Sequence, residues 1–130
     1  MKLSTLVSYN EVILVKFTAK TLSVSEISDP SALKNRAEKW WVGKADTIKS
    51  IGNLIVSYEG EIIAAYKCGQ LDRTPKENSI CFKADEKGHM RMKLQLTDNK
   101  KNSSNIICRK IIDNARWPFR VIKTHELELQ

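Results

Sequence analysis

The stretch Asn53–Cys68 reads NLIVSYEGEIIAAYKC and consists of two short apolar runs on either side of a turn, Glu59-Gly60-Glu61. Two runs rich in β-branched and aromatic residues around a glycine turn predict a β-hairpin. Neither run has a regularly polar face, so both arms are expected to be buried. The centre of the fold is therefore predicted to be a sheet.

Further strands are expected outside this hairpin, at Glu11–Ala19, Ile80–Ala84, Met90–Leu96 and Arg120–Thr124. The first of these, EVILVKFTA, is a β-branched run without helical spacing, which is typical of a buried strand. In Met90–Leu96, apolar side chains alternate with Arg91, Lys93 and Gln95, the period of two of a half-buried strand. Ile106–Ile112 fits a strand and a helix equally well, and His125–Gln130 is expected to be a polar tail.

One helix is predicted near the start of the chain. Asp29 can accept hydrogen bonds from the free amides of a first turn, and Pro30 follows where a missing N–H costs nothing. The apolar residues of the segment that follows fall on one helical stripe: Leu33, Ala37, Trp40 and Trp41. Ala45–Ile51 fits a helical turn or a loop, and Gln70–Ser79 is predicted to be the longest loop.

The chain of 130 residues suits one domain spanning residues 1–130, and no repeat or second domain is evident. The fold class predicted is α+β, with a small curved sheet or partly open β-barrel of five or six strands and one or two helices. Such a sheet curls into a small barrel or packs a helix on one face.

The sequence also indicates where the protein is located and whether its cysteines are reduced. The first residues resemble a signal peptide only briefly, because Asn10 and Glu11 interrupt the apolar run, and no run approaches the length of a membrane span. A cytoplasmic protein without membrane association is therefore expected. Cys68, Cys81 and Cys108 are an odd number at wide spacing, which predicts reduced thiols in the core rather than a disulfide framework or metal site.

The net charge of +7 is concentrated in residues 100–123. This stretch has one acid, Asp113, and seven basic residues: Lys100, Lys101, Arg109, Lys110, Arg116, Arg120 and Lys123. Trp117 and Phe119 lie among them. Cations that hold phosphates beside a ring that can stack on a base are typical of a nucleic-acid surface. The alternative is a solvated basic face with both aromatic residues in the core.

A second candidate site is the pair Trp40-Trp41, which Arg36 and Lys44 flank. Adjacent residues on a helix lie about 100° apart, so both indoles are buried only where two sides of the helix end are covered. One indole is therefore expected to line a cleft, where its flat face suits a base or a partner's aromatic residue. The alternative is that both pack against the sheet.

Catalysis finds little support in the sequence. His89 and His125 have no partner at metal-ligand spacing, and neither belongs to a nucleophile motif. A glycine-rich phosphate loop and a nucleophile elbow are both missing. The protein is therefore predicted to be non-enzymatic, with no cofactor and no metal.

The middle of the chain resembles PUA-like domains, a family of small β-barrel modules. The resemblance rests on Arg36 with Trp40–Lys44 (WWVGK), then the hairpin Asn53–Tyr66, and on Asn114–Ile122 (NARWPFRVI). It implies a barrel that binds RNA, or reads a modified or flipped base in DNA, in a cleft beside the first helix. The residues that match are Arg36, Trp40, Trp41, Arg116 and Arg120.

The leading prediction is thus a nucleic-acid-binding module that uses the C-terminal basic stretch and a tryptophan-lined cleft. The alternative is a small inhibitor that binds an acidic host protein, such as a phage-encoded anti-defence or anti-nuclease factor. The Lys-, Asn- and Ile-rich composition would suit a mobile-element protein. Such an inhibitor would use the same basic surface, with Trp41 or Trp117 as an interface anchor. The oligomeric state is left open.

Overall fold

The computed structural model describes residues 1–38, 41, 51–68, 82–84, 90–92, 94, 96–99, 105–113 and 117–130, with backbone alone at 82–84 and 90–92. Its main sheet has five strands in the order β6-β3-β2-β1-β8. These are β1 (Glu11–Phe17), β2 (Asn53–Tyr58), β3 (Glu61–Cys68), β6 (Leu96–Asp98) and β8 (Phe119–Lys123). In the described residues β6 and β8 end the sheet without pairing to each other, so the sheet is open and not a closed barrel.

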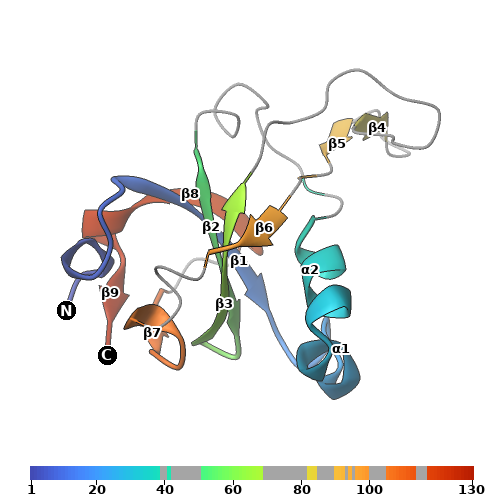
Figure 1. Ribbon diagram of the computed structural model, residues 1–130, viewed down its shortest axis with the longest axis horizontal. Helices are drawn as coiled ribbons and strands as arrows, with labels where there is room; N and C mark the ends of the chain where they lie inside the picture. Colours follow the sequence, from blue (N-terminus) through green and yellow to red (C-terminus); the bar gives the residue numbers. More distant parts are fainter. Residues whose placement is uncertain are drawn as a thin grey trace.

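Helices and shorter elements surround this sheet (Figure 1). The helices are α1 (Val24–Ser28) and α2 (Pro30–Glu38), and the 3-10 turns are η1 (Leu3–Thr5) and η2 (Thr124–Glu126). Two further strand pairs are β4 (Phe82–Ala84) with β5 (Met90–Met92), and β7 (Ile111–Ile112) with β9 (Glu128–Leu129). The predicted α+β class, with a small five-stranded sheet and two helices, is confirmed.

The predicted hairpin is confirmed as β2 and β3, which are antiparallel. Its turn places Glu59 at φ 48° and Gly60 at φ 81°. Two consecutive residues with positive φ are what the twist of a tight hairpin favours, and glycine adopts this conformation without a Cβ penalty. Strand β1 lies beside β2 in parallel, with Ile13 opposite Leu54. Strand β8 closes the other side of β1 in antiparallel, with Val15 opposite Phe119.

Both faces of the sheet are covered, which explains the unbroken apolar run of β1. On one face, Ile13 and Val15 pack with Leu33 and Ala37 of α2. On the other face, Val12 and Leu14 belong to a second cluster, built with Ile106 and with side chains from both ends of the chain: Leu3, Leu127 and Leu129. A strand buried on both faces needs apolar residues at every position rather than at alternate ones. Figure 1 shows the helices on one side of the sheet and the chain ends on the other.

Helix α2 begins where the sequence predicts. The Asp29 carboxylate accepts hydrogen bonds from the backbone N–H groups of Ser31 (3.0 Å) and Ala32 (3.3 Å). Helix α1 was not predicted, although Ser23 and Glu26 have the spacing of a capping box. The Ser23 hydroxyl accepts from the Glu26 N–H (3.2 Å), and the Glu26 carboxylate accepts from the Ser23 N–H (3.1 Å).

Two predictions for the chain's second half need correction. Residues 125–130 are not a polar tail, because Leu127 and Leu129 are buried and β9 pairs with β7. The alternation of Glu and Leu over residues 126–129 is too short to indicate a strand until its partner strand is known. The predicted strand Met90–Leu96 is two strands, since β5 ends at Met92 and β6 belongs to the main sheet. The predicted loop Gln70–Ser79 lies outside the described residues, as does nearly all of Ala45–Ile51.

The segment predicted as either helix or strand contains a short turn followed by β7. The turn ends at Cys108, whose φ is 72° and whose side chain is exposed. The prediction of a core thiol is therefore wrong for Cys108. Cys68 is half-buried, and its burial raises the pKa of the thiol to about 11, so it is protonated at neutral pH. Cys81 lies outside the described residues.

Candidate functional site

An aromatic cluster of Phe17, Trp41 and Phe119 lies where β1 ends and β8 begins. The Trp41 and Phe119 rings are stacked, with centroids 5.0 Å apart and planes 12° apart. The Phe17 ring lies 6.1 Å from the Trp41 ring at 46°. The Trp41 indole N–H donates to the Ala37 carbonyl (2.7 Å). Trp41 is thus half-buried and packs against the sheet, as the structural alternative predicted for it.

Arg36 adjoins this cluster from α2. Its guanidinium lies 5.8 Å from the centre of the Phe17 ring, within the range of a cation–π contact. The same group donates to the Thr21 carbonyl and pairs with the Glu26 carboxylate (3.3 Å). The pKa of Glu26 is lowered, mainly by its hydrogen bonds with Ser23 and to a lesser extent by Arg36. Arg36 therefore joins the two helices to the sheet, which leaves fewer of its N–H groups for a ligand.

On the opposite face of the same sheet edge, one carboxylate holds two cations. Asp113, whose side chain is 6% exposed, pairs with Arg120 (2.7 Å) and with Lys16 (3.4 Å). Lys16 also donates to the Asp113 carbonyl (3.2 Å). Because side chains alternate along a strand, Lys16 and Arg120 point away from the face that Phe17 and Phe119 occupy. We name Lys16, Asp113 and Arg120 the ionic cluster.

The aromatic pair of the basic stretch is divided between solvent and core. Phe119 packs against the core through Trp41, whereas Trp117 is 71% exposed. The Lys16 N–H donates to the Pro118 carbonyl (2.8 Å), which fixes the backbone beside Trp117 against β1. The predicted burial alternative is thus wrong for Trp117.

The other predicted site residues lie away from the aromatic cluster or outside the described residues. The Arg109 Nε–H donates to the Asn105 carbonyl (3.0 Å). The side chain of Lys110 is exposed, and its backbone carbonyl accepts from the Gln130 N–H (2.9 Å). Both residues therefore lie beside the strand pair of β7 and β9. Trp40, Lys44 and Arg116 lie outside the described residues. The structure thus brings Arg36, Trp41, Trp117 and Arg120 to one end of β1, with Arg120 on the opposite face from Arg36 and Trp41.

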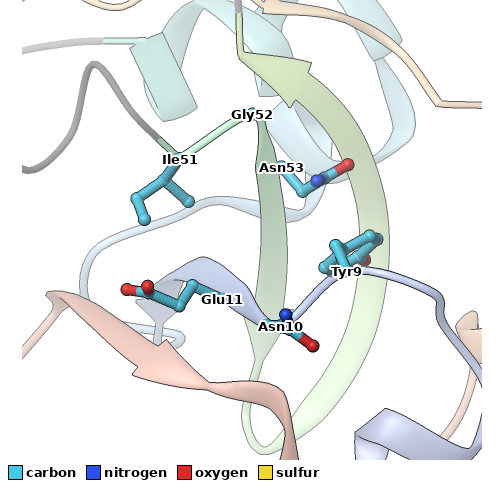
Figure 2. A pocket seen from close by; sticks show the side chains of 6 residues that line it. All are labelled: Tyr9, Asn10, Glu11, Ile51, Gly52 and Asn53. Carbon is cyan, nitrogen blue, oxygen red and sulfur yellow. The ribbon is translucent and has the colours of Figure 1, made fainter.

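A pocket of about 220 Å³ lies at the other end of β1, where β1 and β2 both begin (Figure 2). Six residues line it: Tyr9, Asn10, Glu11, Ile51, Gly52 and Asn53. None of them is a predicted site residue. Parallel strands begin at the same edge of a sheet, so the polar residues before β1 and at the start of β2 meet there. The sequence does contain these polar residues, but it does not show that the two strands are neighbours.

Burial affects one further titratable group beside the sheet. The pKa of Tyr66 is raised to about 12, mainly by burial and then by the carboxylates of Asp98 and Glu38. Within the described ranges, no three His, Cys, Asp or Glu side chains are grouped so that they could hold a metal ion. In the same ranges, no helix has the length and apolar character needed to cross a membrane.

Comparison with known proteins gives no relative from which a role could be taken. No protein-family model, no curated protein and no solved structure matches this chain.

Proposed function

We propose that this protein is a non-enzymatic module that binds nucleic acid through the surface around Trp117. The observation that carries the proposal is the 71% exposure of this indole within the most basic stretch of the chain. Tryptophan is enriched among the residues that carry binding energy at interfaces, so an exposed indole among cations is a candidate contact. The flat face of an indole stacks on a nucleobase whatever the base sequence.

Exposed cations of the same basic stretch suit the second part of nucleic-acid recognition, which is contact with phosphates. Lys110 is exposed beside β7, whereas the exposed Lys123 lies at the far end of β8 from Trp117, opposite Glu11. Arg120 and Lys16 share the single carboxylate of Asp113, so the ionic cluster keeps a net positive charge. Lys110 has no ion pair among the described residues, and it is the better candidate for a phosphate contact.

The proposal retains the predicted relationship to PUA-like domains. Its supports are the resemblance of the hairpin and of the segment 114–122, together with the proximity of Arg36 and Trp41 to the start of β8. A tryptophan-lined cleft and the reading of a modified base remain predictions. The open sheet leaves β8 as an edge strand, and this edge would be the path of the nucleic acid.

The test measures binding of fluorescent RNA and DNA oligonucleotides, single-stranded and duplex, by anisotropy at several salt concentrations. Trp117→Ala is expected to weaken binding at least about fivefold, since one base stack is worth about 1–3 kcal/mol. Trp117→Phe keeps a ring and should retain most of the affinity. The unfolding midpoint of both variants should equal the parent's, because the indole is exposed.

A second set of variants tests the phosphate contacts. Lys110→Gln should weaken binding uniformly across sequences and lower the salt slope by about one. Ile112→Ala, at an exposed apolar residue of β7, serves as the control and should leave binding unchanged. Parent affinity in the Trp117→Ala variant at low salt would exclude this surface as the contact. Absence of any binding at low salt would instead favour the acidic protein partner.

A further inference from the structure

Backbone hydrogen bonds fix the segments that line the pocket at the start of β1 and β2. Buried Thr124 donates from its hydroxyl to the Tyr9 carbonyl (2.8 Å) and from its N–H to the Asn10 carbonyl (2.8 Å). On the other strand, the Gly52 carbonyl accepts from the Cys68 N–H (2.9 Å). Both walls are therefore fixed before any ligand arrives, which lowers the entropy cost of binding.

The side chains that line the pocket include hydrogen-bond acceptors and one negative charge, but no positive charge. The lining contains one carboxylate, Glu11, two amide side chains, Asn10 and Asn53, and no Lys or Arg. Among the described residues no hydrogen bond or ion pair involves the Glu11 carboxylate, although Lys123 is its register partner on β8. In a protein of net charge +7, this hollow is a local site for a positive group.

The apolar parts of the lining define the shape of that group. Figure 2 shows Glu11 and Ile51 on one side of the strand ends and Tyr9 and Asn53 on the other. Gly52, which has no side chain, also lines the pocket, and residues from both sides line the same continuous cavity. An elongated ligand can therefore place a cation on Glu11, methylene groups on Ile51 and a polar end toward the amides.

We propose that this pocket binds an alkylguanidinium group, held by the Glu11 carboxylate. A guanidinium is planar and carries several fixed donors that match a carboxylate, and it is less strongly hydrated than an ammonium ion. Its alkyl chain suits Ile51, and a polar group at the far end of that chain suits the amides of Asn10 and Asn53. The group belongs to a free small molecule or to an arginine side chain of a polypeptide. The site is independent of the nucleic-acid surface, because it lies at the opposite end of β1 from Trp117 and shares no residue with that surface.

The experiment titrates the full chain with agmatine at low salt and follows backbone amide shifts by NMR. Shifts confined to residues 9–11, 51–53 and their neighbours are expected, with a Kd of about 1 mM or lower. 1,5-Diaminopentane, which has the same charge and a similar length but two ammonium groups, should bind at least about threefold more weakly. Absence of shifts at these residues, or equal binding of both ligands, would overturn the proposal.

Three variants locate the contact. Glu11→Gln keeps the shape of the side chain and should weaken agmatine binding at least about tenfold. Gly52→Val adds bulk at a position whose φ is not positive and where a Cβ meets no atom within 4 Å, so it should block the pocket without unfolding the protein. Glu61→Gln, at the opposite end of β2 and β3, is the control and should bind like the parent. Parent affinity in Glu11→Gln would overturn the proposal.

A blocked tripeptide, Gly-Arg-Gly, identifies the source of the group. Tighter binding of agmatine supports a free small molecule, and tighter binding of the peptide supports an arginine of a partner chain. Oligonucleotide binding by Glu11→Gln should equal the parent's, so failure at this pocket and failure at the Trp117 surface are distinguishable.

Discussion

At the scale of single residues, Asp113 is a nearly buried carboxylate with two cationic partners. Its carboxylate is nearly inaccessible and lies between two cations from neighbouring strands, Lys16 of β1 and Arg120 of β8. The cost of moving a carboxylate out of water is offset only while both cations remain in place. Asp113 thus fixes the edge strand to the centre of the sheet.

Asp113→Asn should destabilise the protein by about 2 kcal/mol. A buried pair broken on one side typically costs about 3–5 kcal/mol, but here both cations are partly exposed and water can compensate. Urea unfolding measures the loss. Asp98→Asn, at an exposed carboxylate of β6, is the control and should change stability by less than about 0.5 kcal/mol. Equal losses in the two variants would contradict the role assigned to Asp113.

At the scale of elements, the short helix α1 depends on its cap as well as on the packing of Ile27 against the core. Val24–Ser28 contains no buried residue, and a five-residue helix is too short to be stable by propensity alone. Its two capping hydrogen bonds satisfy backbone donors of the first turn, and Arg36 links its Glu26 to α2. The sequence contained this signal as Ser23 and Glu26, three residues apart.

Ser23→Ala should cost about 1 kcal/mol of stability, because the Glu26 N–H loses its acceptor. Chemical denaturation and amide exchange at residues 24–28 measure the effect, and Ser23→Asp should restore most of it. Ser31→Ala is the control, because it makes the same substitution in the first turn of α2, where Asp29 rather than the Ser31 hydroxyl caps the helix. This variant should keep the parent's stability. A similar loss from both alanine variants would argue against the capping box.

At the scale of the whole molecule, the two ends of the chain close one face of the sheet together. The Leu3 N–H donates to the Leu127 carbonyl (2.9 Å), and both side chains are buried. The Glu128 carboxylate pairs with the amino group of Met1 (2.8 Å) and with Lys2 (2.9 Å). These hydrogen bonds lower the pKa of Glu128 to about 2, from its ordinary value of 4.5.

This lowered pKa predicts how stability depends on pH. Because the folded state has the lower pKa, the contribution of Glu128 is complete above about pH 4.5 and is lost as the pH falls toward about 2. Glu128→Gln should therefore lower the melting temperature at pH 6, and the difference from the parent should disappear near pH 2. Glu126→Gln should show no such trend. A difference that is constant from pH 7 to pH 3 would contradict the prediction.

Local patterns were sufficient for several elements. The hairpin of β2 and β3, the apolar run of β1 and the cap of α2 each depend on residues close together in sequence, and all three predictions are confirmed. The same locality explains the predicted site. Arg36 and Trp41 belong to one predicted helix, although α2 ends at Glu38, and Trp117 and Arg120 belong to one basic stretch. Neither pattern indicates how these segments meet.

The tertiary structure alone decided which segments are neighbours. The sequence by itself determined an α+β chain with a buried hairpin and a concentrated basic stretch. It could not determine that β1 and β2 are parallel, which creates the pocket, or that Leu127 and Leu129 complete the core. Nor could it place Trp117 in solvent and Phe119 beneath Trp41. The physical reason is that short strands are compatible with several partners and either face, and only long-range packing selects one arrangement.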